Sequence, residues 1–242
     1  MLLTVAYDGT NYCGWQRQQN GPSIQQTLEE ALAVLLARPV KTTASSRTDA
    51  GVHALGQCVA FDAPDLKIPP DKLPQVLNSL LPPDIAVQHA RPVPPEFHPR
   101  FHPRHKTYLY QVLNTIIQNP LQSRYAAHIA QPLHFEAMQA AAHHFIGHHD
   151  FAAFCAAGHS AKTTTRYIYH CALTRQDALL SLQITGNAFL YNMVRIIAGT
   201  LIYVGLGKIP PDAIPQIIAD RDRTKAGKTL PPCGLTLVEV VY

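Results

Sequence analysis

The sequence predicts an α+β protein made of two similar halves. Strand-like and helix-like segments follow one another in the order strand, helix, strand, strand, helix, and the same order recurs after residue 105. Between the two runs, residues 91–103 contain five prolines and no hydrophobic periodicity, as is typical of a connector. The chain has 242 residues, 47% of them hydrophobic, which is enough material for a sizeable core. We therefore expect an N-terminal half at 1–104 and a C-terminal half at 105–242.

The first half opens with a β-type run at residues 2–7, followed by a polar loop at 8–21. Ser23 is a candidate N-cap, and Gln26 three residues later completes a capping box. Apolar residues then recur at helical spacing until Pro39, which ends the helix. Beyond it we expect strands at 40–45 and 57–62, a helix at 71–81 and a strand at 85–89.

The second half begins with alternating strand character at residues 106–113. A helix follows around Met138 to Phe145 and ends at Gly147, because glycine is a poor helix former. The remaining expected elements are strands at 166–174 and 178–185, a strongly apolar helix at 190–204 and a strand at 235–242.

A short echo links the two halves. Ile68-Pro69-Pro70-Asp71 and Ile209-Pro210-Pro211-Asp212 each precede an apolar segment that carries a proline and a glutamine. An old internal duplication would produce this echo. A common helix start would produce it too, because Asp caps helices and Pro is tolerated in the first turn. The second interpretation is favoured, since the echo does not extend along the rest of the halves.

The composition limits the classes of protein to which the chain can belong. A formal charge of +4 permits a polyanionic partner without requiring one. The five cysteines are scattered and form no CxxC pair, which argues against a disulfide framework and a zinc site and for the reducing cytoplasm. The N-terminus has no basic stretch before Asp8, unlike a signal peptide. The longest apolar stretch, 188–204, is interrupted and too short to span a bilayer comfortably.

The polar loop at residues 45–54 is the most informative segment. Gly51 permits a tight turn or the close approach of a ligand. Arg47 and Asp49 are two residues apart on an extended segment, so both side chains can face the same way. A neighbouring arginine lowers the pKa of an aspartate, which suits a nucleophile or an electrostatic stabiliser rather than a general acid. On composition alone, however, an ordinary turn with an Asp-stabilised backbone is the favoured interpretation.

Residues 47–54, with the sequence RTDAGVHA, closely resemble the catalytic motif of the tRNA pseudouridine synthase A family. The other similar segments occur in the family's order and span almost the whole chain. They are 7–16 (YDGTNYCGWQ), Lys106 with Tyr108 and Tyr110, 147–154 (GHHDFAAF), 186–195 (GNAFLYNMVR), and the tail from Ala226-Gly227 to Gly234-Leu235.

The resemblance implies an enzyme that isomerises uridines at positions 38–40 of the tRNA anticodon stem-loop to pseudouridine. It implies a homodimer that needs no cofactor or metal, with two halves whose mixed, largely antiparallel sheets join around a central basic cleft. By motif position, Asp49 is the essential carboxylate. Tyr108 resembles the residue that stacks on the target base, and Arg195 resembles the one placed to pair with the carboxylate. Arg47 and Leu235 also match substrate-binding positions.

Several of these positions have a simpler interpretation from the residues alone. Tyr108 and Tyr110 could place one ring in the core and one on the surface of a strand. Arg195 is the only charge between residues 188 and 204, and a charge in an apolar helix is costly unless it is paired. Its head could instead reach the surface. Asp49 is the partner that we expect for it.

Two groups of basic residues are candidates for phosphate contacts. Either group could equally be a solvated face. The first consists of Arg100, Arg104 and Lys106, interleaved with Phe101, His102 and His105; the second consists of Arg221, Arg223, Lys225 and Lys228.

Other site types are less well supported. His144 and His148 are four residues apart, but Gly147 lies between them and no further ligand set has a metal-binding spacing. Ser46, Asp49 and His53 lie too close in sequence to form a triad, and the chain has no G-x-S-x-G motif. A glycoside hydrolase needs two carboxylates, whereas the loop offers one. A non-catalytic RNA-binding protein is the remaining alternative, and the presence of Asp49 favours the enzyme.

Overall fold

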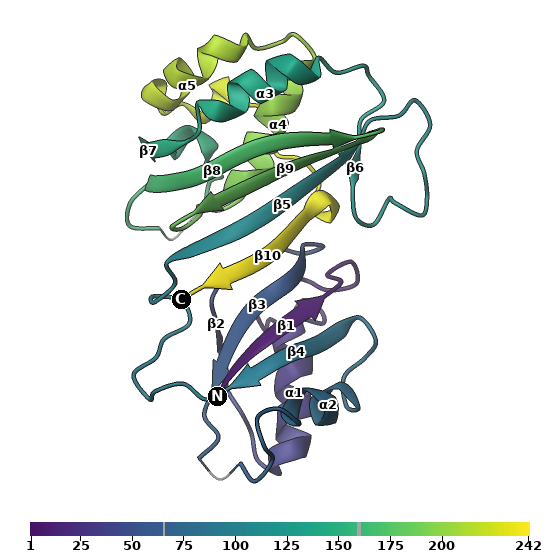
Figure 1. Ribbon diagram of the computed structural model, residues 1–242, viewed down its shortest axis with the longest axis vertical. Coiled ribbons are helices and arrows are strands. Elements are labelled where there is room, and N and C mark those ends of the chain that lie inside the picture. Colours follow the sequence, from purple (N-terminus) through teal and green to yellow (C-terminus); the bar gives the residue numbers. More distant parts are fainter. Residues whose placement is uncertain (65, 159–160) are drawn as a thin grey trace. The chain divides into compact units, whose positions relative to one another are not determined.

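A computed structural model describes residues 1–64, 66–158 and 161–242 (Figure 1). The chain divides into two compact units, the first formed by residues 1–104 with 236–242 and the second by 105–235. Each unit combines a sheet with helices, and most strand pairs in the two units are antiparallel. The α+β class and the mixed, largely antiparallel pairing that the sequence predicts are therefore confirmed.

The sheet of the first unit has the strand order β4-β1-β3-β10, with β2 paired to β3. The strands are β1 (Leu2–Tyr7), β2 (Thr42–Ala44), β3 (His53–Phe61), β4 (Ile85–Arg91) and β10 (Leu235–Val241). The β1 strand is antiparallel to both of its neighbours, whereas β10 runs parallel to β3. Chain order alone assigns residues 236–242 to the second half, but their pairing with His53 and Ala54 of β3 brings them into the first unit.

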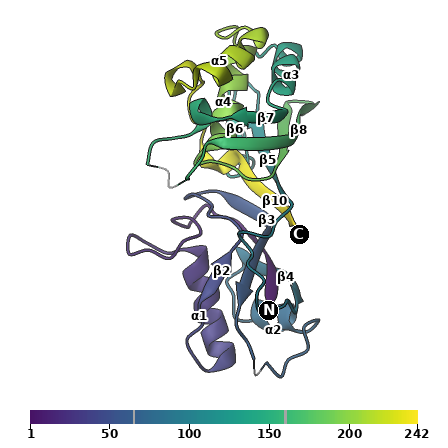
Figure 2. The same ribbon diagram turned by 90° about the vertical axis from the view of Figure 1, so that its left-hand side faces the viewer.

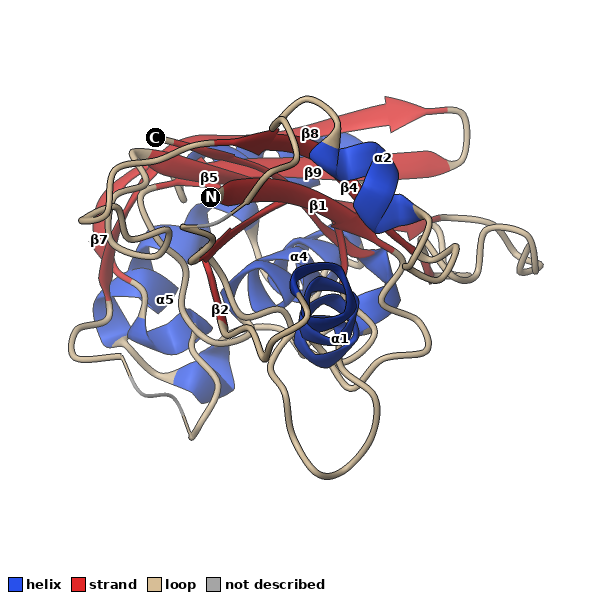
Figure 3. Cartoon of the chain, turned by 90° about the horizontal axis from the view of Figure 1, so that it is seen from below, coloured by secondary structure: helices blue, strands red, loops and turns tan. Residues whose placement is uncertain are grey.

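Two helices accompany this sheet, α1 (Ile24–Leu36) and α2 (Leu73–Asn78). Figure 3 shows α1 against one face of the strands. The expected capping box is present in part, since the Ser23 hydroxyl accepts a hydrogen bond from the Gln26 backbone N–H at 3.3 Å. The inward positions of α1 are fully buried, among them Ile24, Leu28 and Leu32. The apolar stripe read from the sequence is therefore the face that packs on the sheet.

The second unit has the antiparallel strand order β5-β9-β8-β7, with the short β6 parallel to β5. The strands are β5 (His105–Leu113), β6 (Ala127–His128), β7 (Gly147–Asp150), β8 (Thr165–Gln176) and β9 (Leu179–Gly186). The helices α3 (Phe135–His143), α4 (Met193–Gly205) and α5 (Ile214–Asp220) gather on one side of these strands (Figure 2). Short 3₁₀ turns lie at 152–154, 211–213, 223–225 and 232–234.

The α4 helix forms the centre of the second unit, because almost all of its side chains are buried. The segment after α5 crosses it closely. A Cβ atom on Gly199 would lie 1.8 Å from the Lys228 carbonyl oxygen, and the Gly227 N–H donates to the Thr200 hydroxyl at 2.9 Å. This backbone-to-backbone contact is possible only because both positions are glycine.

Several boundaries differ from those expected from the sequence. The β3 strand begins at His53, not at residue 57, because its first residues pair with β1 and β10. The helix expected at 71–81 is limited to 73–78, and the one expected at 190–204 begins at Met193. Gly147 is the first residue of a strand, β7, that the sequence did not suggest. The joining of the two sheets around a basic cleft stays a prediction.

Candidate active site

The loop between β2 and β3 is fixed at its start by a buried polar contact. Gln57 of β3 is completely buried and Ser45 is 1% exposed. The Gln57 side-chain amide donates to the Ser46 carbonyl oxygen at 2.7 Å, and its Oε1 lies 2.7 Å from the Ser45 hydroxyl. The Ser45 N–H also donates to the Cys58 carbonyl at 2.8 Å. Because buried polar groups are costly when unpaired, these bonds hold the loop entrance in one conformation.

The middle of the loop is held by the segment that follows β1. The Trp15 N–H donates to the Thr48 carbonyl at 3.0 Å, and the Thr48 and Tyr7 hydroxyls share a hydrogen bond of 2.7 Å. A Cβ atom on Gly14, which has φ +91°, would lie 2.7 Å from the Thr48 carbonyl oxygen. A Cβ atom on Gly9 would lie 2.0 Å from the Val52 oxygen. Two glycines therefore let one backbone rest directly on the other.

Asp49 lies in the part of the loop that is held in this way. Its residue is half-buried, Thr48 before it is buried, and Arg47 is exposed. The Val52 N–H closes the turn by donating to the Asp49 carbonyl oxygen at 3.1 Å. A carboxylate on a fixed backbone, still partly open to solvent, can reach a bound substrate with little loss of conformational freedom.

A buried histidine follows the loop and was missed by the sequence analysis as a structural partner. His53 Nδ1 lies 3.1 Å from Asp8 Oδ1, and the Gly9 N–H is directed at the same nitrogen from 3.1 Å. The neutral ring accepts from Gly9, and the protonated ring donates to Asp8. In either state His53 ties the end of the loop to the segment after β1. The two residues are 45 positions apart, so no local pattern could pair them.

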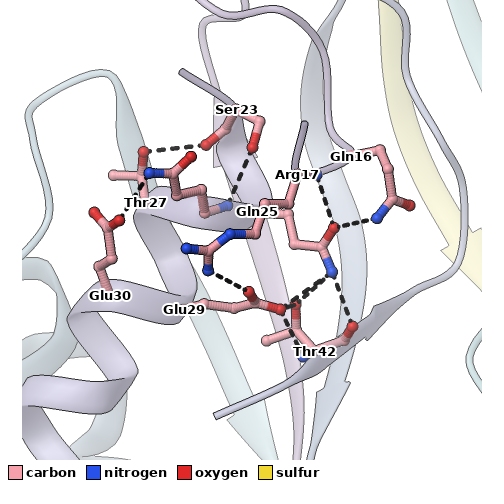
Figure 4. Close-up of polar contacts among 9 residues, drawn as sticks. Gln16, Arg17, Ser23, Gln25, Thr27, Glu29, Glu30 and Thr42 are labelled. Atoms are coloured by element: carbon pink, nitrogen blue, oxygen red, sulfur yellow. Dashed lines mark hydrogen bonds and ion pairs between the residues drawn. The ribbon is translucent and has the colours of Figure 1, made fainter. Parts of the chain in front are cut away.

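A second polar network ties the loop's neighbours to α1 (Figure 4). Glu29 is 8% exposed, and its Oε1 accepts from the Thr42 N–H at 2.9 Å, the Thr42 hydroxyl at 3.0 Å and the Gln25 amide at 3.1 Å. Its Oε2 lies 3.3 Å from Arg17 Nη1. A buried carboxylate with this many donors is well compensated for its lost hydration.

Gln25 extends the same network to the segment before α1. Its Oε1 accepts from the Gln16 side-chain amide at 2.7 Å and from the Arg17 N–H at 3.0 Å. The network therefore joins three parts of the chain: residues 16–17, α1 and β2. Because β2 leads directly into the loop, the network fixes the direction from which the loop starts.

The aromatic candidate lies in the second unit. Tyr108 of β5 is 8% exposed and contacts Phe189 edge to face, with 4.9 Å between ring centroids. Tyr110 is 1% exposed, its hydroxyl donates to the Pro231 carbonyl at 2.7 Å, and burial raises the pKa of its phenol. The suggestion that one ring is in the core and the other on the surface is wrong. Residues two apart in a strand share a face, and both rings are buried.

Arg195 lies in the first turn of α4 and is half-buried. Its Nε donates to the Leu230 carbonyl at 2.8 Å, and its Nη1 donates to Asn192 Oδ1 at 2.7 Å. These two hydrogen bonds orient the guanidinium group, so its position is fixed by contacts within the protein and not by hydration alone. The carboxylate of Asp49 as a further partner stays a prediction. Leu235, the other candidate near this segment, is 7% exposed.

The two basic groups differ in their surroundings. Arg100 and Arg104 are exposed and Lys106 is half-buried. In the second group two cations form ion pairs. Arg221 Nε lies 3.1 Å from Asp150 Oδ2, and Lys225 Nζ lies 2.7 Å from Asp220 Oδ2. Arg223 donates to the Thr229 hydroxyl at 3.2 Å. Arg100 and Arg104 are therefore open to solvent, whereas the cations Arg221 and Lys225 are paired with carboxylates.

In the part of the chain that the structure describes, no group of three or more His, Cys, Asp or Glu residues is placed to hold a metal ion. Among the helices of the same residues, none has the length and apolar character needed to cross a bilayer. None of the five cysteines forms a disulfide.

A family model described as tRNA pseudouridine synthase matches residues 3–102 and 141–242. The "tRNA pseudouridine synthase A" of Caldicellulosiruptor bescii is 50% identical over 242 residues, covering 100% of this chain and 99% of that protein. The protein of the same name from Geotalea uraniireducens is 48% identical over 240 residues, covering 99% and 98%.

Among solved structures, the chain is similar to one described as "Crystal Structure of a Cbf5-Nop10-Gar1 Complex". It matches with a TM-score of 0.42 and 12% sequence identity, covering 98% of this chain and 48% of that chain.

Proposed function

The chain belongs to the tRNA pseudouridine synthase family, and from this premise we propose that it converts uridine to pseudouridine in the anticodon stem-loop of tRNA. The target uridines at positions 38–40 are part of this proposal. The reaction is an isomerisation, in which the bond from ribose to base nitrogen 1 breaks and the ribose is rejoined to base carbon 5. The observation that carries the proposal is the loop at 47–54, where Asp49 stands on a backbone held by Trp15 and closed by Val52.

Asp49 is the essential carboxylate in this proposal. Three routes use it: attack on the sugar, attack on the base, or removal of a sugar proton. In the first two, a covalent intermediate divides one difficult substitution into two easier steps. Each of the three routes uses the ionised carboxylate, and Arg47, which is exposed and two residues away, is assigned to substrate binding.

The target nucleotide must leave its stack to reach Asp49, at a cost of a few kcal/mol. We assign Tyr108 to receive the flipped base, with Leu235 as an apolar neighbour of the substrate. The edge-to-face contact with Phe189 supports this role for Tyr108, because it fixes the plane of the ring. Arg195 is assigned to the Asp49 carboxylate, and its bonds to Leu230 and Asn192 would hold the guanidinium ready for it.

The phosphates of the tRNA are assigned to Arg100, Arg104, Lys106, Arg221 and Arg223. Neutralising phosphates releases counterions and makes the affinity strongly dependent on salt. The exposure of Arg100 and Arg104 supports the first group as the larger contributor, because Arg221 would first have to leave Asp150.

The proposal includes a homodimer that works in the cytoplasm without a cofactor or metal. Light scattering at working concentration tests the dimer, since a monomer has a mass of 26.7 kDa.

The decisive experiment is incubation of the protein with tRNA labelled in its uridines, followed by nucleoside analysis. Pseudouridine is the expected product. Unchanged uridine would indicate a non-catalytic RNA-binding protein, and free uracil would indicate a glycosidase. Either of these results would overturn the proposal.

A further inference from the structure

The connector between β4 and β5 displays an aromatic ring to solvent. Phe101 is 72% exposed, more than Val34, Leu55 or Leu80, the other large hydrophobic residues of the first unit that are exposed in the described chain. A phenyl ring in water is unfavourable, because its apolar surface must be hydrated. A partner that covers such a ring removes this apolar surface from water, which favours binding.

The backbone around Phe101 is held firmly in place. The Tyr242 hydroxyl donates to the Pro99 carbonyl at 2.9 Å, and the Arg104 N–H donates to the Val241 carbonyl at 2.7 Å. The Phe97 ring packs against Tyr242 with 4.9 Å between centroids. The connector is thus attached to the end of β10 on both sides of the exposed ring.

The turn itself is also closed internally. The Phe101 N–H donates to the His98 carbonyl at 3.2 Å, and the Arg100 N–H donates to His98 Nδ1 at 3.1 Å. Phe101 is therefore an exposed side chain on an ordered turn. A ligand that binds there loses little affinity to ordering of the backbone.

The neighbours of the ring are planar and cationic. The His98 ring lies 4.3 Å from the Phe101 ring, tilted by 30°, and the Arg100 guanidinium carbon lies 5.8 Å from the ring centroid. Residues 91–104 contain three arginines and a single carboxylate, Glu96. Unstacked nucleobases bind to aromatic and guanidinium planes, and arginines bind the adjoining phosphates.

We propose that Phe101 is a stacking platform for an unpaired base of the bound tRNA, distinct from the target uridine, with Arg100 on a neighbouring phosphate. The inference rests on the proposed function, because it takes tRNA as the substrate. The positive charge of the connector favours a polyanion over an apolar protein surface as the partner of the ring.

A fluorescence titration tests for stacking directly. The chain has a single tryptophan, Trp15, which is 1% exposed. Phe101→Trp adds an exposed indole, and its emission should be quenched when a tRNA transcript is titrated. Val34→Trp is the matched control, because Val34 is 69% exposed and lies on α1. Its emission should not change over the same titration.

Binding measurements then separate stacking from charge. Phe101→Ala should raise the Kd for tRNA about tenfold, with an unchanged slope of log Kd against log salt. Phe101→Trp should stay within about twofold of the wild type, because the larger ring still stacks. Phe101→Leu, which is apolar without a π-face, should resemble the alanine variant. At saturating tRNA the rate of pseudouridine formation should be that of the wild type for all three variants.

The proposal fails if Phe101→Ala binds within twofold of the wild type, if Phe101→Leu binds as tightly as Phe101→Trp, or if the new indole is not quenched. It also fails if Phe101→Ala changes the mass in light scattering while its Kd for tRNA is unchanged, since the ring would then be a protein interface. Each of these results leaves the proposed function intact when the wild type forms pseudouridine. If the wild type forms none, the proposed function is wrong whatever Phe101 does.

Discussion

Asp49 combines partial exposure with a backbone that has little freedom to move. Asp49→Asn keeps the shape of the side chain and removes its nucleophilic charge. We expect turnover to fall by at least about 10⁴-fold, while the Kd for tRNA changes less than about threefold. Single-turnover pseudouridine formation and equilibrium binding on the same preparation measure the two quantities. Wild-type turnover in the variant would refute the role given to this carboxylate.

Arg195 is bound to two groups of its own unit, so the cost of its removal does not depend on Asp49 alone. Arg195→Ala leaves the Leu230 carbonyl and the Asn192 amide without this donor and should lower the free energy of unfolding by about 2 kcal/mol. An Arg195→Ala variant as stable as the wild type would show that these contacts contribute nothing to the fold.

The proposed pair is tested by a double-mutant cycle. If Arg195 pairs with Asp49, the stability changes of Asp49→Asn and Arg195→Met should differ from additivity by about 1 kcal/mol, with the double variant more stable than the sum predicts. Denaturation curves of the four proteins give this coupling. Additivity within about 0.3 kcal/mol would show that the two side chains do not pair, even if Asp49 proves essential.

At the residue scale the sequence predicts the chemistry of the site but little of its support. Asp49, Arg47 and Tyr108 were found because a motif marks them, and the structure leaves their roles as proposals. The contacts of His53 with Asp8 and of Glu29 with Thr42 join residues that are far apart in sequence. No periodicity indicates which buried polar residues will meet, because that depends on the packing of whole elements.

At the scale of elements, the segment after β1, residues 8–15, packs its backbone directly on the loop at 45–54 that carries Asp49. We call this segment the brace. Gly14→Ala places a methyl group 2.7 Å from the Thr48 carbonyl oxygen at a φ of +91°. We expect a loss of about 1–3 kcal/mol in stability from backbone strain, and a fall in kcat because the Thr48–Asp49 backbone must shift.

The control for this variant separates strain from displacement. Gly207→Ala has a similar strain, with φ +71°, but no heavy atom lies within 4 Å of the added methyl group. It should cost stability and leave kcat unchanged. A Gly14→Ala variant with wild-type kcat would show that the brace does not position Asp49.

The Glu29 network gives a second prediction at this scale. Glu29→Gln turns one acceptor oxygen into an NH₂ group that faces donors, so the unfolding free energy should fall by about 2 kcal/mol. Glu30→Gln is the matched control, since Glu30 lies on the same helix, is exposed, and accepts a hydrogen bond from the Gln26 side-chain amide at 2.9 Å. Its effect should stay within about 0.5 kcal/mol. Equal stability of the two variants in urea would contradict this view of the network.

Most elements could be predicted from local patterns, and the exceptions share a cause. The strand β1 and the helix α1 follow from alternation, capping and helical spacing. The early start of β3 and the short strand β7 depend on partners elsewhere in the chain. A strand of four residues such as β7, with three polar side chains, carries no signal of its own and is defined by its neighbour β8.

At the scale of the whole molecule, the surroundings of the basic residues predict how the affinity for tRNA depends on salt. Arg100 and Arg104 are exposed, whereas Arg221 and Lys225 are paired with carboxylates. Each phosphate contact contributes about 0.9 to the slope of log Kd against log salt. Arg100→Ala or Arg104→Ala should therefore lower the slope by about one. Lys225→Ala should change it less, because Asp220 already pairs with that lysine. A slope unchanged from the wild type in both Arg100→Ala and Arg104→Ala would show that these two connector residues do not contact the phosphates of the tRNA.

The two-part organisation was predictable from the repeated order of elements, whereas the return of β10 to the first unit was not. That return has a consequence for how the protein is made. The sheet that carries the catalytic loop lacks one of its strands until residues 236–242 have been synthesised, although β3 left the ribosome some 180 residues earlier. During that interval one side of β3 has no β10 to pair with, and an unpaired strand edge invites mispairing. We therefore expect this protein to depend most on chaperones in the interval before residues 236–242 have been synthesised.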